Sequence, residues 1–274
     1  MICRGESFRK DYGKIGSDII ARLSTTTVMV FSATASALEQ EELIKKLGLR
    51  SPKMVNRNPD RPNIAYVKFE RPPSTQTLDH LEIILQPIVD ELISQKEEYP
   101  LTILYSDVSV IGFCYWFFEK KMGEQQYVGD SRPENRLFAQ YHASYTEKMK
   151  THIVSEICND KSRIRIVFAT VALGMGLNAK SVREVIHYKP PTSLSKYFQE
   201  TGRAGRDGLP AIARLYYNAT DIRSNRPGIN SDIVKYCRNT TKCYRQIMLE
   251  RFGYQVYDAG FDKKACCGFC ALQE

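Results

Sequence analysis

The segment Gln199-Glu-Thr-Gly-Arg-Ala-Gly-Arg-Asp-Gly208 decides how the rest of the chain is interpreted. Its two arginines, Arg203 and Arg206, follow a polar stretch, residues 193–200, that carries apolar residues at helical spacing. Residues i and i+3 share a helix face, so both guanidinium groups can point at one anion. Arginine suits a phosphate because its planar fork stays charged and pairs with two oxygens. A glycine-rich turn with solvated arginines is the alternative, and ten residues in this order disfavour it.

Further segments carry a resemblance to a known family. The decamer resembles the sixth motif of superfamily 2 helicases, in the form found in RecQ-like DNA helicases, and Phe168-Ala-Thr-Val-Ala-Leu-Gly-Met-Gly-Leu-Asn178 resembles the fifth. Ser32-Ala-Thr34 resembles the third motif, and Ser7-Phe-Arg-Lys-Asp-Tyr12 the stretch after the acidic ATPase box. DEAD-box RNA helicases are similar at Ser32-Ala-Thr34 but usually carry a different sixth motif. The resemblance covers nearly the whole chain.

The resemblance implies an ATP-dependent 3'–5' DNA helicase of repair and recombination, using ATP with Mg²⁺ and acting on single strands and duplex junctions. It implies a nuclear location in a eukaryote, and otherwise the cytoplasm or nucleoid. The catalytic residues that it implies are Gln199, Arg203 and Arg206. ATP contacts fall on Gly174, Gly176, Asn178 and the same two arginines. The implied DNA contacts are Ser106, His142, Ala169 and Thr170, and the implied coupling residues are Ser32, Ala33 and Thr34.

Two parts of such an enzyme are missing from the sequence. Nothing matches G-x-x-x-x-G-K-[ST], the loop whose backbone amides and lysine hold ATP phosphates, and there is no Asp-Glu-x-His box. We therefore expect a truncated product or partial gene model, and we expect the isolated chain not to hydrolyse ATP, because arginines alone do not assemble a phosphoryl-transfer site. The alternative is a non-catalytic nucleic-acid-binding or regulatory protein with a helicase-like fold.

Composition agrees with an anionic partner. The chain has 274 residues, 43% of them hydrophobic, and a formal net charge of +8. That length allows one large or two modest domains, and the positive charge favours nucleic acid. Residues 101–118 are mostly apolar and about as long as a membrane span. Asp107 interrupts them, so we predict a buried strand, a polar turn and a helix capped near Ser109.

Strands and helices are expected to alternate between residues 63 and 221. The predicted strands are residues 64–69, 101–105, 138–142, 164–169, 182–188 and 213–217, and the predicted helices are 77–95, 110–122, 146–158 and 193–203. This alternation predicts an α/β fold, a RecA-like, mostly parallel sheet with helices on both faces. Ligands of such sheets bind where strands end. Ser106, Thr170 and the loop with Gly174 and Gly176 fall at these ends.

The predicted sheet is flanked by two further regions. Residues 1–62 read as the incomplete tail of a first RecA-like domain, with helices near residues 17–23 and 37–47 and a strand at 28–31. One strand alone cannot close a sheet, so this tail needs outside support. Residues 63–221 form the second RecA-like domain, and residues 222–274 a small helical zinc-binding subdomain.

Five of the eight cysteines lie in the last forty residues. Cys267-Gly-Phe-Cys270 has the spacing with which two thiolates bind one Zn²⁺. The family resemblance assigns a third ligand to Cys243, ahead of an aromatic-glycine step. We predict Cys266 as the fourth ligand, with Cys237 in reserve, since adjacent residues such as Cys266 and Cys267 tend to direct their side chains apart. A cysteine-rich tail without metal is the alternative.

Overall fold

The computed structural model describes residues 13–23, 26–32, 35–72, 79–159, 161–174, 177–255, 262 and 264–273. The described part of the chain divides into two units. The smaller unit combines residues of Met1–Asp60 and Gln246–Tyr257, and the larger combines residues of Arg61–Arg245 and Asp258–Glu274. The first boundary lies close to the predicted boundary at residue 62, whereas residues 222–245 belong to the same unit as the sheet.

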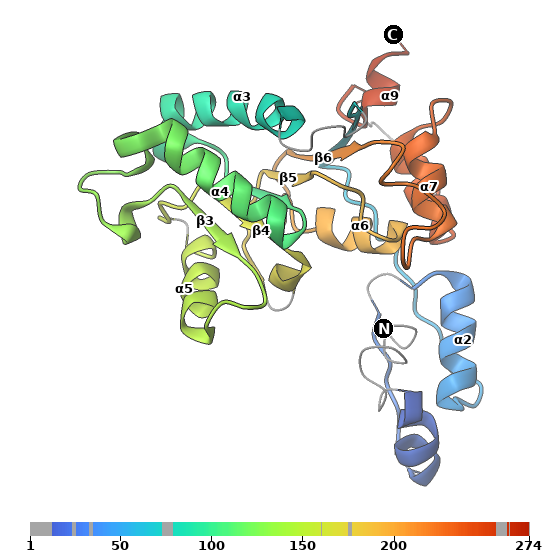
Figure 1. Ribbon diagram of the computed structural model, residues 1–274. Helices are drawn as coiled ribbons and strands as arrows, with labels where there is room; N and C mark the ends of the chain where they lie inside the picture. The colour runs from blue at the N-terminus through green and yellow to red at the C-terminus, as the bar shows by residue number, and fades with distance from the viewer. Residues whose placement is uncertain are drawn as a thin grey trace. The chain divides into compact units, whose positions relative to one another are not determined.

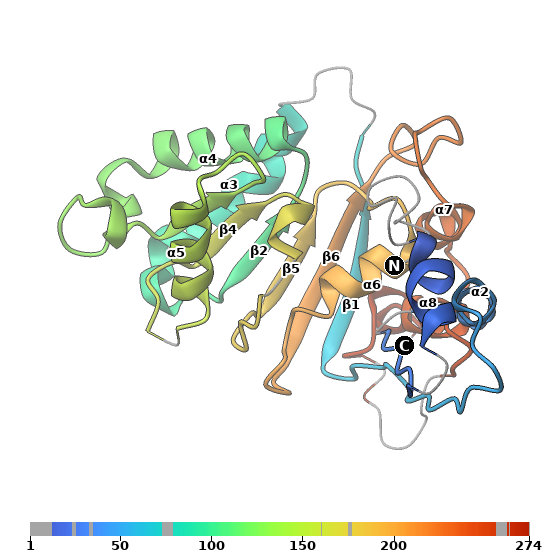
Figure 2. The same cartoon turned by 90° about the horizontal axis from the view of Figure 1, so that it is seen from below.

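The larger unit is built on six parallel strands. They are β1 (Ile64–Glu70), β2 (Thr102–Tyr105), β3 (Phe138–Tyr141), β4 (Ile166–Ala169), β5 (Glu184–His187) and β6 (Ala211–Tyr217). Their order across the sheet is β1-β6-β5-β2-β4-β3, and every pairing is parallel. Figure 2 shows β1 and β6 side by side at one edge of the sheet. The predicted parallel sheet is therefore confirmed.

Helices cover both faces of this sheet. Helices α3 (Asp79–Gln95) and α4 (Val108–Met122) lie on one face, and α5 (Glu147–Ile157) and α6 (Leu194–Thr201) lie on the other (Figure 1). The residue before α4 is Asp107, two residues ahead of the expected cap. The apolar segment 101–118 is thus strand β2, a polar turn and most of α4. No helix among the described residues combines the length and apolar character that crossing a membrane requires.

The core of the larger unit lies between the sheet and helices α3 and α4. Every residue of β2, β4 and β5 is buried, as expected for central parallel strands covered on both faces. The ring of Phe118 on α4 meets Phe168 of β4 edge-on, with centroids 4.9 Å apart, and Phe138 of β3 at 5.5 Å. This packing fixes the strands whose ends carry the predicted site residues.

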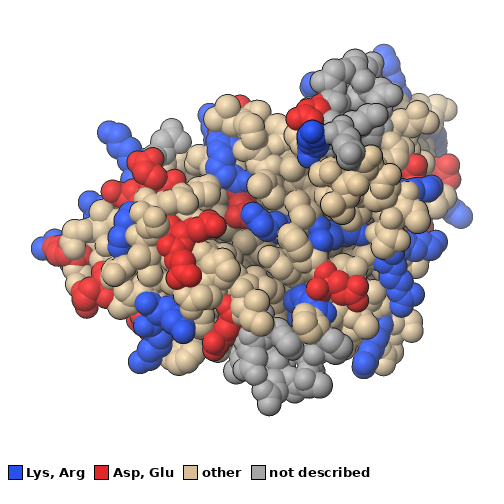
Figure 3. All heavy atoms as spheres, turned by 90° about the horizontal axis from the view of Figure 1, so that it is seen from above, with Lys and Arg blue, Asp and Glu red and all other residues tan. Residues whose placement is uncertain are grey.

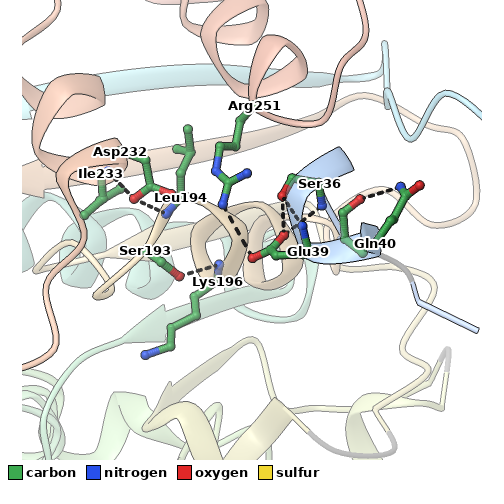
Figure 4. Close-up of polar contacts among 10 residues, drawn as sticks. Ser36, Glu39, Gln40, Ser193, Leu194, Lys196, Asp232, Ile233 and Arg251 are labelled. Atoms are coloured by element: carbon green, nitrogen blue, oxygen red, sulfur yellow. Dashed lines mark hydrogen bonds and ion pairs between the residues drawn. The ribbon is translucent and has the colours of Figure 1, made fainter. Parts of the chain in front are cut away.

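Helix α2 (Ala37–Leu47) lies in the smaller unit and agrees with its predicted bounds. Figure 4 shows its capping box, in which the Ser36 amide donates to Glu39 at 2.7 Å and the Glu39 amide donates to the Ser36 hydroxyl at 3.3 Å. Gly48, with φ of +63°, ends the helix. Arg251 forms an ion pair with Glu39 at 3.5 Å.

The predicted strand at residues 28–31 is wrong. These residues form no strand, and Met29 and Phe31 are 72% and 83% exposed. An isolated strand leaves its amide and carbonyl groups unpaired, and the described residues of this unit offer no neighbouring strand. The predicted helix at 17–23 is an irregular π-helix, Ile15–Ile19, followed by a 3₁₀ turn, Ile20–Arg22.

Short helices complete the larger unit and its C-terminal region. The C-terminal helices are α7 (Ser231–Arg238), α8 (Tyr244–Arg251) and α9 (Gly268–Ala271). The 3₁₀ turns of the larger unit are Lys96–Glu98, Gly123–Gln126, Pro133–Asn135 and Val171–Gly174. Figure 4 also shows the start of α6, where the Ser193 hydroxyl accepts from the Lys196 amide and Asp232 accepts from the Leu194 amide, both at 3.3 Å.

Candidate functional site

The arginine loop, residues 202–210, joins α6 to β6. Helix α6 ends at Thr201, so Arg203 and Arg206 do not lie on one helix face, and the predicted continuation of the helix to residue 203 is wrong. The chain turns instead at Gly205, whose φ is +56°. The amide of Gly205 donates to the carbonyl of Val182 at 2.8 Å. A left-handed glycine, rather than helical periodicity, therefore sets the directions of the two arginines.

The two arginines nevertheless reach the same segment of chain. Arg203 is 5% exposed, and its Nη2 donates to the carbonyl of Gly174 at 2.7 Å. Arg206 is exposed, and its Nη1 donates to the carbonyl of Leu177 at 2.7 Å and to Oδ1 of Asn178 at 3.2 Å. Gly174 and Asn178 were both predicted as ATP contacts. In this structure they are the hydrogen-bond acceptors of the arginines, while Gly176 lies outside the described residues.

Arg61 is a third arginine at this loop, and the sequence pattern did not indicate it. Its guanidinium donates to the carbonyls of Ala204 at 3.3 Å and Gly205 at 2.5 Å. Burial lowers the pKa of Arg206, and the neighbouring charges of Arg203 and Arg61 lower it further. Three guanidinium groups held by neutral carbonyls make an electropositive site that suits a phosphate.

The Arg183–Asp207 ion pair and the side-chain amide of Asn63 hold the arginine loop in place. Both Nη atoms of Arg183 contact the Asp207 carboxylate, one of them at 2.9 Å. Hydrogen bonds from Arg183 lower the pKa of Asp207. Asn63 Nδ2 donates to the carbonyls of Gly205 and Leu209, both at 2.8 Å. The loop is thus held at residues on either side of Arg206.

A buried pair of polar side chains lies next to the loop. Nε2 of His187, at the end of β5, is 2.8 Å from Oε2 of Glu200 on α6, and both residues are buried. The His187 ring stacks on Tyr105, with centroids 5.2 Å apart. Burial raises the pKa of Tyr105, whereas the charge of Arg203 opposes the rise. Sequence reasoning missed this pair, although Glu200 shares a helix face with the apolar Tyr197 three residues earlier.

Three of the predicted DNA contacts follow adjacent strands at the carboxyl edge of the sheet. Ser106 follows β2, Thr170 follows β4 and His142 follows β3, and these three strands are neighbours in the order β2-β4-β3. The three side chains are partly exposed. Nδ1 of His142 is buried without a hydrogen-bond partner in the described part of the chain. The sheet therefore brings these residues to one edge.

Two of the remaining predicted residues have different environments. Ala169 is fully buried, and its carbonyl accepts the Ser106 amide at 3.0 Å, so it positions Ser106 and offers no side chain to a ligand. Gln199 is exposed on α6. Ser32 is described, but Ala33 and Thr34 lie outside the described residues, so the predicted coupling motif has no structural account.

Four cysteines form a second candidate site. The Sγ atoms of Cys243, Cys266, Cys267 and Cys270 all lie within 4.8 Å of one another. Sulfur–sulfur distances are 3.5 Å for Cys243–Cys266, 3.8 Å for Cys243–Cys267 and 3.5 Å for Cys267–Cys270. Four thiolates at about 2.3 Å from a tetrahedral Zn²⁺ are separated by about 3.8 Å. The donor set therefore fits zinc, and Cys237 is not a member of it.

The four-cysteine cluster is built against strand β1. The amide of Tyr66 donates to the carbonyl of Cys266 at 3.2 Å, and Tyr66 forms a parallel bridge with Cys267. The amide of Tyr244 donates to Sγ of Cys267 at 3.4 Å. Hydrogen bonds from Cys243 and Cys266, and from the Tyr244 amide, lower the pKa of Cys267. The cluster therefore favours the thiolate form, which binds metal, at Cys267, whereas hydrogen bonds with Cys243 and Cys267 raise the pKa of Cys266.

The chain matches a known domain family and a set of curated proteins. The family model "Helicase conserved C-terminal domain" matches residues 88–208. The chain is 30% identical over 279 residues to "ATP-dependent DNA helicase Q-like 2" of Arabidopsis thaliana, an alignment that covers 98% of this chain and 36% of that protein. It is 30% identical to "ATP-dependent DNA helicase Q1" of Pongo abelii, with coverage of 97% and 39%. The chain thus spans little more than a third of these relatives.

Solved structures agree on the fold. Mss116p bound to ssRNA and AMP-PNP superposes with a TM-score of 0.58 at 17% identity, over 80% of this chain and 42% of that one. Dbp5 of S. cerevisiae, bound to RNA and ADP BeF3, gives a TM-score of 0.55 at 16% identity, over 78% and 50%. Because the sequence identity is this low, the similarity bears on the fold alone, which is RecA-like.

Gly205→Ala should destabilise the larger unit and displace the arginine loop. A β-carbon at Gly205 would lie 2.4 Å from Nδ2 of Asn63 and 2.8 Å from the carbonyl of Leu209. Left-handed backbone alone costs an alanine about 1–2 kcal/mol. Gly208→Ala is the matched control, because Gly208 has φ of +85° in the same loop but no atom within 4 Å of a β-carbon.

We expect urea unfolding to show a loss of about 1 kcal/mol for Gly208→Ala and a loss at least about twice as large for Gly205→Ala. Equal losses would mean that the contacts of Gly205 with Asn63 and Leu209 do not constrain the loop.

Proposed function

The chain corresponds to the C-terminal part of a RecQ-like helicase, and on that premise we propose that it supplies the arginine side of an ATP site and a nucleic-acid groove to an ATP-dependent 3'–5' DNA helicase. In the whole enzyme two RecA-like domains close on ATP and step along one strand. Such an activity would serve DNA repair and recombination. The observation that carries the proposal is the convergence of Arg61, Arg203 and Arg206 at one loop.

The arginines act on the phosphates of ATP. Phosphoryl transfer spreads negative charge over the γ-phosphate, and a guanidinium delivered from a neighbouring domain stabilises it. Arg206 is the residue for this role because it is exposed and its present acceptors, Leu177 and Asn178, are neutral. Arg203 is buried and holds Gly174, so it supports the loop and reaches a phosphate only after its bond to Gly174 breaks. Mg²⁺ and the phosphate loop belong to the other domain.

The nucleic-acid groove runs along the carboxyl edge of the sheet, where Ser106, His142 and Thr170 follow three neighbouring strands. Small hydroxyl side chains and backbone amides of this kind contact phosphates without reading the bases. In Figure 3, Lys and Arg side chains form short groups separated by acidic ones on the face shown. Positive and negative side chains are thus mixed on that face, and the net charge of +8 supplies attraction for nucleic acid at long range.

The four-cysteine cluster is proposed to hold one structural Zn²⁺. A closed set of four thiolates leaves no position open for water or substrate, so the ion stabilises the fold and performs no chemistry. It would join the start of α8 and the start of α9 to the Cys266 segment beside β1. Metal binding and local folding are coupled in such sites.

Arg206→Ala is expected to abolish ATP turnover when the chain is expressed with an upstream domain that carries a phosphate loop. Removing the arginine that stabilises transferred charge costs about 10³-fold or more in turnover, while nucleic-acid affinity should change by less than about twofold. Arg132→Ala is the control, since Arg132 is exposed and its guanidinium forms an ion pair with the exposed Asp130. Near-normal steady-state hydrolysis by the Arg206 variant would remove Arg206 from this role.

Binding of the chain to fluorescently labelled single-stranded DNA should be weak, independent of sequence and at least about tenfold weaker at about 200 mM salt than at about 50 mM, because phosphate contacts release counterions. Thr170→Glu places a negative charge at the proposed groove and should weaken binding further. Thr151→Glu is the matched control on the exposed surface of α5. Equal affinity of the two variants in fluorescence anisotropy would place the groove elsewhere.

One zinc ion per chain is expected in metal analysis of the purified protein. Cys266→Ser should lose the ion, because its Sγ is a member of the four-sulfur group, and Cys237→Ser should keep it. Burial raises the pKa of Cys237 to about 12, and its Sγ lies outside the four-sulfur group. Zinc retained by Cys266→Ser and lost by Cys237→Ser would show that the fourth ligand is Cys237.

A further inference from the structure

Lys68, on strand β1, reaches the end of helix α7. Its Nζ donates hydrogen bonds to the carbonyl oxygens of Tyr236 at 2.6 Å, Cys237 at 3.0 Å and Asn239 at 2.8 Å. The last carbonyl groups of a helix have no partner within the helix, and a cation is favoured beside them. Lys68 therefore caps α7 from a strand that lies far away in the sequence.

The same ammonium group faces an aromatic ring that adjoins the four-cysteine cluster. Nζ of Lys68 lies 4.2 Å from the centre of the Tyr244 ring and 5.1 Å from that of Tyr236. Ring faces attract cations, more strongly where water is excluded. The amide of Tyr244 donates to Sγ of Cys267 at 3.4 Å. One residue thus separates the lysine charge from a cluster sulfur.

No carboxylate forms an ion pair with Lys68 among the residues that the structure describes, and its three hydrogen bonds go to neutral carbonyls. Burial lowers the pKa of Lys68 to about 8. A half-buried ammonium without an anion is costly. The cluster sulfur that the described contacts bring nearest to it is Sγ of Cys267, which accepts the Tyr244 amide.

Arg245 supplies a second cation beside the same cluster. It is fully buried and donates to the carbonyls of Arg61, at 2.8 Å, and Ile64. Arg245 lies two residues after Cys243, so its guanidinium is held close to the start of the cluster. Four thiolates around one Zn²⁺ keep two negative charges, so two nearby cations would balance them.

We propose that Lys68 is a counter-ion of the four-cysteine cluster, and that its positive charge retains the metal while joining α7 and the cluster to strand β1. This inference rests on the proposed zinc site. Groups outside the ligand set that stabilise bound ligands commonly change metal affinity by about 10–100-fold. Lys68 differs from an ordinary helix cap because the charge, and not only the hydrogen bonds, is required.

Three substitutions separate charge from capping. Lys68→Gln keeps an NH₂ donor for the carbonyls of α7 but carries no charge. Lys68→Met removes both, and Lys68→Arg keeps the charge with a different shape. Lys121→Gln is the matched control, because Lys121 also lies over a ring, that of Phe117 at 5.3 Å, but belongs to α4. Each chain is loaded with zinc, its metal content is measured, and zinc release to a chromogenic chelator is followed in time.

We expect zinc release to be about tenfold faster, or more, for Lys68→Gln and Lys68→Met than for the unchanged chain. Lys121→Gln and Lys68→Arg should stay within about threefold. Release from Lys68→Gln at the unchanged rate would overturn the counter-ion role and leave only a helix cap. If Lys68→Gln does not fold by circular dichroism, Lys68→Arg decides: fast release despite its charge overturns the proposal. An unchanged chain that binds no zinc overturns the zinc site as well, whereas the nucleic-acid groove is tested separately.

Discussion

The pairing of β1 with β6 is the constraint on which both candidate sites depend. Residues just before β1 hold the arginine loop that leads into β6, through Arg61 and Asn63. The middle of β1 binds the Cys266 segment through Tyr66, and Lys68 two residues later caps α7. One strand at the edge of the sheet therefore positions the candidate phosphate site at its start and the candidate metal site along its length. A change that shifted β1 by one residue would exchange its two faces and disturb both sites.

Both sites hold cations by means of carbonyl groups. Arg61, Arg206 and Lys68 each donate to backbone carbonyl oxygens, with shortest distances of 2.5–2.7 Å. A carbonyl fixes the position of a cation without cancelling its charge, whereas a carboxylate would neutralise it. The positive potential thus stays available for an anion, for which we have proposed phosphate at the arginine loop and thiolate at the cluster. Where the structure uses a carboxylate, as in the Arg183–Asp207 pair, the arginine serves to hold the loop.

The sequence predicted the sheet well because its signals are local. Apolar runs of four to seven residues between polar turns mark buried parallel strands wherever they occur, and all six strands lie at or within two residues of their predicted bounds. Helix α2 has its predicted bounds because Ser36, Glu39 and Gly48 begin and end it through contacts close in the sequence. The strand at residues 28–31 was wrong for the complementary reason. An apolar run becomes a strand only if another strand pairs with it, and no local pattern reports whether one does.

The sequence by itself determined which residues lie at the carboxyl edge of the sheet. Ser106, His142 and Thr170 each follow a strand, and parallel strands all end at the same edge. It also determined that Cys267 and Cys270 can share an ion, because their spacing is short. Only the tertiary structure decided that Arg203 is buried while Arg206 is exposed, because Gly205 turns the chain where helical periodicity would have continued. It also brought Arg61 into contact with Ala204, 143 positions away in the sequence, and Lys68 into contact with Asn239, 171 positions away. Spacing and periodicity describe neighbours along the chain, whereas these contacts exist only once β1 has paired with β6.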